Sequence, residues 1–284
     1  MKTSDQQAKA QQLGALHRGP RILVLANAWD AASARLFEAA EFPAIATTSA
    51  GIANSLGYAD GQHVSRDEML AVVKRIAGAV SIPVTADMEA GFGDSPKAIA
   101  VTTRAVIAAG AVGMNLEDRA PADRSVLFDV SLQVEKIKAV REAAASADVA
   151  FVLNARTDVF LLGVGEPASR LDHAIRRANA YRQAGADCLF VPGVIDHETI
   201  GLLAREIQGP INILAVPGSP PVAELEKLGV ARVSVGSGIM RATMGLARRI
   251  AKELLESGTY LNLTDGTIPF AEMNQLFPSA ARKQ

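Results

Sequence analysis

The feature that most constrains the fold is a strict alternation, repeated eight times, of short β-rich apolar runs and longer amphipathic stretches. Such alternation predicts parallel strands joined by helices. We expect strands at 22–26, 44–48, 82–87, 111–117, 149–155, 186–191, 211–215 and 231–235. We expect helices at 30–40, 66–79, 96–109, 131–145, 167–184, 196–206, 220–228 and 239–257. Gly110 and Gly185 support these boundaries, because glycine readily adopts the left-handed conformation that ends a helix.

Eight strand and helix units in about 250 residues match the size of a (β/α)₈ TIM-type barrel. An open, doubly wound sheet of eight strands is the main alternative. We therefore expect an α/β chain with one barrel domain over residues 1–284, its core at about 21–258 and a C-terminal extension at 259–284. Phe270 and Phe277 predict that the extension docks on the barrel or on a neighbouring subunit.

The charge of the chain argues against two large classes of partner. The 29 Lys and Arg against 30 Asp and Glu give a net charge of −1, which offers no electrostatic case for nucleic acid or an anionic membrane. No apolar run approaches the roughly 18 residues of a membrane helix, and residues 1–12 are unlike a signal peptide. A single cysteine excludes a disulfide-stapled scaffold. We expect a cytoplasmic protein that acts on small molecules.

Charged side chains follow three neighbouring predicted strands. Asp87 and Glu89 lie at the end of the third, Glu117 at the end of the fourth and Arg156 at the end of the fifth, where a barrel collects its chemistry. Clustered carboxylates repel unless they are protonated or bridged by a cation. Oxygen donors without nearby His or Cys suit Mg²⁺, with Mn²⁺ as a second choice. We interpret the three acids as metal ligands; the alternative is that they cap helices or pair with surface lysines.

Candidate anion-binding groups follow the second and fifth predicted strands. The planar guanidinium of Arg156 suits a carboxylate or phosphonate, and a salt bridge to the acidic cluster is an alternative compatible with substrate binding. Ser49, Ala50 and Gly51 would let backbone N–H groups and a hydroxyl approach an anionic ligand closely. Cys188, inside a predicted strand, is interpreted as a small buried hydrophobic residue.

Five segments occur in a characteristic order: Thr48-Ser49-Ala50-Gly51, Leu56-Gly57-Tyr58-Ala59-Asp60, Asp87-x-Glu89-x-Gly91-Phe92-Gly93, Leu116-Glu117-Asp118 and Ala155-Arg156-Thr157-Asp158. Together they resemble the isocitrate lyase and phosphoenolpyruvate mutase superfamily, over roughly Arg21 to Gly258. The resemblance implies a (β/α)₈ barrel whose last helix is swapped within a dimer, with two dimers forming a tetramer. It also implies stabilisation of a pyruvate-type enolate near a magnesium ion.

The site residues that the resemblance implies are Asp60, Glu117 and Arg156 as catalytic residues, Ser49, Ala50, Gly51 and Arg156 as substrate-binding residues, and Asp87, Glu89 and Glu117 as metal ligands. Three departures from the family pattern are visible. Isocitrate and methylisocitrate lyases carry a Lys-Arg-Cys-Gly-His lid where this chain reads 118–125 without cysteine. The mutase-like branch has a histidine where this chain has Val191-Pro192-Gly193, and Glu89 replaces the usual aspartate.

We expect a Mg²⁺-dependent lyase that cleaves a carbon–carbon bond in a small 2-oxo or 2-hydroxy carboxylic acid through an enolate. One alternative is a phosphonomutase or carbon–phosphorus hydrolase acting on phosphonopyruvate-like substrates. A second alternative is an oxo-acid-binding protein with little catalysis. Residues 118–129 exceed the usual length of a strand-to-helix connection, so we expect a mobile lid in which Arg119 and Arg124 are best suited to reach the substrate.

Overall fold

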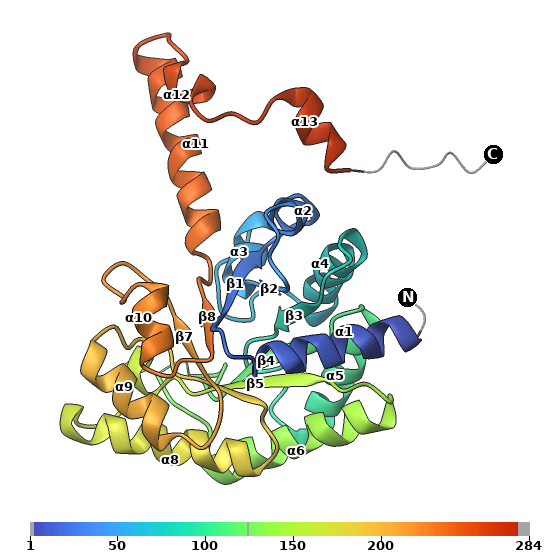
Figure 1. Ribbon diagram of the computed structural model, residues 1–284, viewed down its shortest axis with the longest axis vertical. Coiled ribbons are helices and arrows are strands. Elements are labelled where there is room, and N and C mark those ends of the chain that lie inside the picture. The colour runs from blue at the N-terminus through green and yellow to red at the C-terminus, as the bar shows by residue number, and fades with distance from the viewer. Residues whose placement is uncertain (1–2, 124, 278–284) are drawn as a thin grey trace.

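The strands form a closed barrel. The computed structural model describes residues 3–123 and 125–277, and over these residues eight parallel strands pair in chain order, with β1 also pairing with β8 (Figure 1). The strands are β1 (Leu23–Ala28), β2 (Ile45–Thr47), β3 (Val84–Asp87), β4 (Gly113–Glu117), β5 (Val152–Arg156), β6 (Cys188–Phe190), β7 (Ile211–Leu214) and β8 (Arg232–Ser234). The predicted TIM-type barrel is confirmed, and the open sheet is excluded because β1 and β8 are hydrogen-bonded neighbours.

The eight predicted helices are present as α2 (Ala31–Ala39), α4 (Arg66–Ala79), α5 (Pro96–Ala108), α6 (Val130–Ser146), α8 (Arg170–Gln183), α9 (His197–Glu206), α10 (Val222–Lys227) and α11 (Gly238–Glu256). Their first turns are set locally. At α5, for example, Ser95 Oγ accepts a hydrogen bond from the Ala98 N–H at 3.2 Å, and Pro96 has no N–H to leave unbonded. Helices that we did not predict are α1 (Thr3–Leu16), α3 (Ser49–Ser55), α7 (Val159–Leu162), α12 (Leu261–Thr264) and α13 (Phe270–Gln275). The first turn of the helix predicted at 167–184 is a 3₁₀ helix, η1 (Pro167–Ser169), which leads directly into α8.

The register of the sheet brings the predicted site residues to one rim. Asp87 pairs with Asn115 across β3 and β4, and Glu117 pairs with Arg156 across β4 and β5. Parallel neighbours in register present side chains on the same side of the sheet. The carboxyl ends of three consecutive strands therefore hold an acid, an acid and an arginine within one region of the barrel mouth.

Helix α1 packs against the opposite end of the barrel. Its Leu13 is fully buried, beside Gly113 and Val152 at the starts of β4 and β5. A Cβ at position 113 would lie 2.7 Å from the Val152 carbonyl oxygen and 3.1 Å from Leu13 Cδ2, so glycine is needed for this close approach. His17, just after the helix, is also buried and lies 2.8 Å from the Leu13 carbonyl oxygen through Nδ1.

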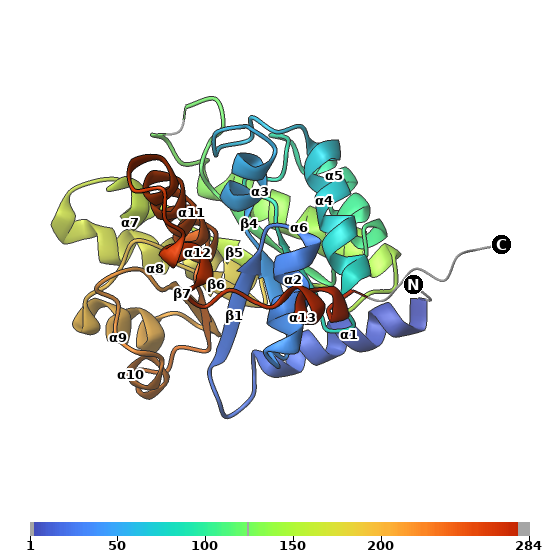
Figure 2. The ribbon, with the colours of Figure 1, turned by 90° about the horizontal axis from the view of Figure 1, so that it is seen from above.

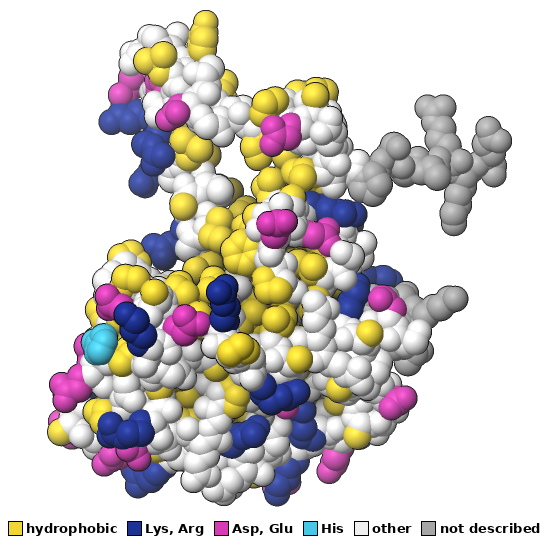
Figure 3. All heavy atoms as spheres, viewed as in Figure 1, with side chains coloured by type: hydrophobic (Ala, Val, Ile, Leu, Met, Phe, Trp, Pro, Cys, Tyr) yellow, Lys and Arg dark blue, Asp and Glu magenta, His cyan; other side chains and the backbone are white. Residues whose placement is uncertain are grey.

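The C-terminal arm, α11 to α13, extends away from the barrel (Figure 1). Figure 2 shows the same arm from above, with α11 seen nearly end-on. Within α11, all of which is described, Met240 alone is buried. Phe270 on α13 is 86% exposed, so the expectation that it docks on its own barrel is wrong; docking on a neighbouring subunit stays a prediction. Hydrophobic side chains gather on the face where the arm leaves the barrel (Figure 3). The described part of the chain contains no helix with the length and apolar character needed to cross a membrane.

Candidate active site

Asp87 ends β3 and is held by the start of α3. Its Oδ2 accepts hydrogen bonds from the backbone N–H of Ser49 at 3.1 Å and from Ser49 Oγ at 2.8 Å. Its backbone N–H donates to Thr47 Oγ1 at 2.8 Å. The other carboxylate oxygen, Oδ1, is buried and has no hydrogen-bond partner among the described residues. Asp87 is thus fixed in orientation with one oxygen left for a ligand.

Glu89 follows in a strained loop. It is a non-glycine residue with a φ of 49°, and Phe92 in the same loop has a φ of 56°. Such left-handed backbone costs about 1–3 kcal/mol and concentrates at functional sites. The Glu89 carbonyl accepts a hydrogen bond from the Glu117 N–H at 2.9 Å, which joins this loop to the end of β4. Glu89 itself is buried, at 4% exposure.

Glu117 is buried, with 6% of its surface exposed. Burial raises the pKa of Glu117 to about 8; Arg156 opposes this rise, while Asp158, Asp87 and Asp60 add to it. Asp60 lies on the exposed stretch after α3, yet its charge acts on Glu117. Among the predicted catalytic and metal-binding residues, Asp60, Asp87 and Glu117 therefore interact electrostatically.

Arg156 is surrounded by carboxylates. Its Nη1 lies 2.9 Å from Glu117 Oε2, and its Nε and Nη2 donate to the two oxygens of Asp158 at 2.5 and 2.8 Å. Burial lowers the pKa of Arg156, but the attraction of Glu117 and Asp158 outweighs burial and raises it overall. The salt bridge to the acidic cluster, which the sequence left open, is therefore present. The two hydrogen bonds to Asp158 and the ion pair with Glu117 hold the guanidinium in place at the barrel mouth.

The predicted substrate loop proves to be a helix. Ser49, Ala50 and Gly51 form the first turn of α3, capped by Thr48, whose Oγ1 accepts from the Gly51 N–H at 3.2 Å. A Cβ at position 51 would lie 2.6 Å from Thr48 Cγ2, so this turn requires glycine. Ser49 faces Asp87 directly, which places the predicted substrate-binding and metal-binding segments in contact.

The arrangement accommodates a divalent cation of the kind that keeps several waters. Over residues 3–123 and 125–277, no three His, Cys, Asp or Glu side chains are grouped closely enough to hold a metal ion by themselves. The unpartnered Oδ1 of Asp87 and the repulsion between Asp87 and Glu117 both favour a cation at this position. Mg²⁺ typically takes one or two protein carboxylates and fills its other positions with water or substrate. These residues therefore fit Mg²⁺.

Several residues of this region were missed at the sequence level. Asp158 binds Arg156 bidentately; it stands in the Ala155-Arg156-Thr157-Asp158 segment, but we assigned it no role from sequence. Lys136 of α6 is fully buried, donates to the Ala90 carbonyl at 3.0 Å and lies 3.9 Å from the centre of the Phe128 ring. Burial lowers the pKa of Lys136 to about 8. No local pattern distinguishes Lys136 from the exposed lysines of an amphipathic helix.

The two ends of the segment expected to be a lid, residues 118–129, pair with each other in an antiparallel manner. Arg119 forms an antiparallel bridge with Leu127, and the Ala120 N–H donates to the Val126 carbonyl at 2.9 Å. At its tip, Ala122, Asp123, Ser125 and Val126 are exposed. Arg124, one of the two arginines predicted to reach the substrate, lies outside the described residues.

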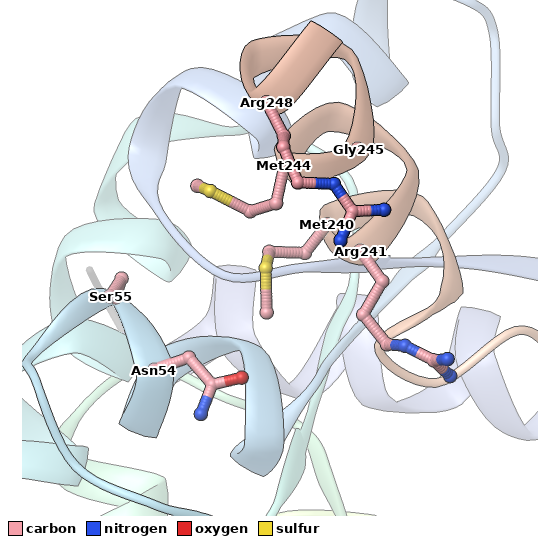
Figure 4. A pocket seen from close by; sticks show the side chains of 7 residues that line it. All are labelled: Asn54, Ser55, Met240, Arg241, Met244, Gly245 and Arg248. Carbon is pink, nitrogen blue, oxygen red and sulfur yellow. The ribbon is translucent and has the colours of Figure 1, made fainter. Parts of the chain in front are cut away.

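A pocket of about 500 Å³ lies between α3 and α11 (Figure 4). It is lined by Asn54, Ser55, Met240, Arg241, Met244, Gly245 and Arg248. Because Ser49 at the start of α3 hydrogen-bonds to Asp87 and α11 follows β8, this pocket adjoins the barrel mouth. The residues that line it do not include Asp87, Glu117 or Arg156.

The fold is a TIM barrel, and its C-terminal mouth, where barrel enzymes carry their active sites, holds buried acids and an arginine bound to carboxylates. These features define a class of enzyme-like barrels.

Comparison with known proteins identifies the family within this class. The family model for phosphoenolpyruvate phosphomutase matches residues 13–255. An uncharacterised protein of Mycobacterium tuberculosis is 35% identical over 91% of this chain and 93% of its own. The 2-methylisocitrate lyase of Escherichia coli is 31% identical over 82% of this chain and 79% of its own.

Solved structures of similar fold lead to the same family. A crystal structure from Burkholderia cenocepacia, described as a lyase/mutase, has a TM-score of 0.89 and 38% identity, covering 95% of this chain and 96% of its own. A structure of phosphonopyruvate hydrolase with oxalate and Mg²⁺ has a TM-score of 0.83 and 27% identity, covering 94% of each chain. The chain belongs to the isocitrate lyase and phosphoenolpyruvate mutase superfamily, whose named relatives are lyases, hydrolases and mutases.

Proposed function

We propose that this chain is a Mg²⁺-dependent lyase that cleaves a carbon–carbon bond in a small 2-oxo or 2-hydroxy carboxylic acid, by decarboxylation or retro-aldol cleavage. The observation that supports this most is the juxtaposition of Asp87, with its free carboxylate oxygen, and the buried Glu117–Arg156 pair. Both cleavages leave negative charge on an enolate, and preorganised positive groups stabilise such charge in a water-poor site.

Asp87 would hold the cation, with Glu89 and Glu117 binding it directly or through water. When bound, the cation would supply a Lewis acid that polarises the substrate oxygen. Arg156 would use N–H bonds that do not bind Asp158 to orient the substrate carboxylate, while Asp158 keeps the guanidinium in place. Glu117, whose Oε2 lies 2.9 Å from Arg156 Nη1, would donate or accept a proton at the reacting carbon if it binds the cation only through water.

Carbon–phosphorus chemistry is the competing reaction. The similarity to phosphonopyruvate hydrolase supports it, whereas the Val191-Pro192-Gly193 sequence after β6 lacks the histidine of the mutase-like branch. A panel of 2-oxo and 2-hydroxy acids, assayed with Mg²⁺ for pyruvate or glyoxylate release, tests the lyase. Release of inorganic phosphate from phosphonopyruvate tests the alternative. Binding without turnover in either assay would indicate an oxo-acid-binding protein.

The test that isolates the site is oxalate titration by calorimetry with and without Mg²⁺. We expect Asp87→Asn to abolish Mg²⁺-dependent oxalate binding, because the substitution removes the ionised oxygen that has no partner. Asp94→Asn, beyond the same strand, is the matched control and should bind as wild type does. Equal Mg²⁺-dependent binding by the Asp87→Asn variant and the wild type would refute the metal site.

We also propose that the chain assembles with copies of itself through the C-terminal arm. The arm exposes Leu255 at 89% and Leu261 at 73%, which is unfavourable for a helix left in water. The family resemblance implies a dimer of dimers with a swapped last helix. A second copy packed against α11 would cover these side chains.

A further inference from the structure

Asp118, the residue after Glu117, points away from the site and is completely buried. Its Oδ2 accepts hydrogen bonds from Arg177 Nε at 2.7 Å and Tyr181 Oη at 2.7 Å, both on α8. Its Oδ1 accepts from the Asp158 N–H at 3.0 Å. Its backbone donates to the Arg156 carbonyl at 3.1 Å and accepts from the Phe128 N–H at 2.7 Å. Every polar group of Asp118 is therefore committed to holding neighbouring segments.

Arg177 holds both ends of the loop 118–128. Its Nε binds Asp118 at the start of the loop, and its Nη2 donates to the Phe128 carbonyl at the end. Arg177 is 5% exposed, and its Nε also donates to the Tyr181 hydroxyl, one helical turn further on, at 3.0 Å. A planar group with several N–H donors can make such a bridge, whereas a single ammonium nitrogen has much less reach.

The same contacts continue into the site. Asp118 fixes the backbone of Asp158, and the Asp158 carboxylate holds Arg156, which pairs with Glu117. A continuous chain of charge-assisted hydrogen bonds thus connects α8 to the guanidinium that faces the candidate substrate. Such bonds are the stronger kind and, when buried, are costly to break.

We propose that Arg177, with Tyr181, is a positioning residue that anchors the base of the 118–128 loop and orients Arg156 through Asp118 and Asp158. The effect on Arg156 rests on the proposed function, whereas the anchoring of the loop does not.

The test compares Arg177→Met with Arg176→Met, the same substitution at the exposed neighbouring position of α8. Hydrogen exchange of the peptide over 118–128, read against a peptide from α4, reports the anchoring without any ligand. We expect at least tenfold faster exchange of the loop in Arg177→Met and no change in Arg176→Met. Relative to Arg177→Met, Arg177→Lys should restore more of the melting temperature than of the loop's protection from exchange. Lysine restores the charge but cannot bind Asp118 and the Phe128 carbonyl at once.

Oxalate affinity in the presence of Mg²⁺ reports the effect on Arg156. We expect Arg177→Met to lower the oxalate affinity tenfold or more and Tyr181→Phe to lower it less. Arg176→Met should bind oxalate as wild type does. If wild type binds no oxalate, the proposed function fails while loop exchange still decides the anchoring. Equal loop exchange in the Arg177 and Arg176 variants overturns the proposal. If Arg177→Met does not fold, unchanged loop exchange and oxalate affinity in Tyr181→Phe overturn it.

Discussion

Glu117 is the residue whose ionisation should be most visible in the stability of the protein. Its pKa is raised to about 8 by burial, so the native state holds a proton that the unfolded state loses near pH 4.5. The stabilisation is fully present below pH 4.5 and is lost as pH rises through 8, because the unfolded state then binds fewer protons than the native state. In chelator, we expect the free energy of unfolding of wild type to fall by about 4 kcal/mol across this window.

Urea unfolding of Glu117→Gln from pH 5 to 8.5 checks this expectation. The neutral amide removes the titration, so the variant should be more stable than wild type at pH 8 and flatter with pH. Glu135→Gln, an exposed acid on α6, is the matched control and should follow wild type. Parallel curves for wild type and Glu117→Gln would contradict the assignment.

For Lys136, a buried cation, we expect the opposite dependence of stability on pH. Its pKa is lowered to about 8 by burial, so between pH 8 and 10.5 the unfolded state binds more protons and wild-type stability should rise with pH. We expect Lys136→Met to be more stable than wild type at pH 7 by about 1–2 kcal/mol, since the lost bond to Ala90 offsets part of the gain. The gap should close by pH 10.5. Lys138→Met, at an exposed position on the same helix, should show neither effect in the same unfolding measurement.

Among the elements, α1 should be the one that responds to mild acid. The pKa of His17 is lowered to about 4, mainly by burial and also by the charge of Arg232. The Nε2 atom of the ring lies 3.5 Å from Arg232 Nη1. Stability from neutral His17 is fully present above pH 6.5 and is lost as pH falls through 4. We expect a loss of about 3 kcal/mol over this window, absent in His17→Gln and retained in His63→Gln, an exposed control. Chemical unfolding at pH 7, 5.5 and 4 measures it.

The strands were predictable from sequence because each is an apolar run bounded by turn residues, and the helices around them because their caps are local, as at Ser95. Helix α3 was not, since Ser49–Ser55 is small-residue sequence whose helical state depends on the cap at Thr48 and the hydrogen bonds to Asp87. Helix α1 carries a polar sequence, and what orders it is tertiary contact of Leu13 with the barrel floor.

The same division holds for the candidate site. Asp87, Glu117 and Arg156 stand at strand ends, where topology alone brings them together. Arg177 meets Asp118 across 59 positions, and Lys136 meets Ala90 across 46. Neither pairing has a local signature, because an arginine or lysine on an amphipathic helix is read as solvated until its neighbours are known.

At the scale of the whole molecule, the C-terminal arm makes a prediction about mass in solution. Replacing Leu255 and Leu261 by glutamate should place charges in the proposed contact and reduce the assembly to single chains. Lys252→Glu, on a position of α11 that is already charged and exposed, should leave the assembly intact. Light scattering after size-exclusion chromatography measures the mass, and a double variant with the wild-type mass would mean that the arm makes no essential contact.

The pairing of β1 with β8 also determines when the barrel can close during synthesis of the chain. Leu23 and Arg232 are neighbours in the sheet but are about 210 residues apart in synthesis, so every earlier intermediate has two open sheet edges. At roughly 5–20 residues per second, the nascent chain spends about 10–40 s with those edges exposed. Newly made chains are therefore most open to chaperone capture and to mispairing during translation, and this period ends only when the eighth strand has left the ribosome.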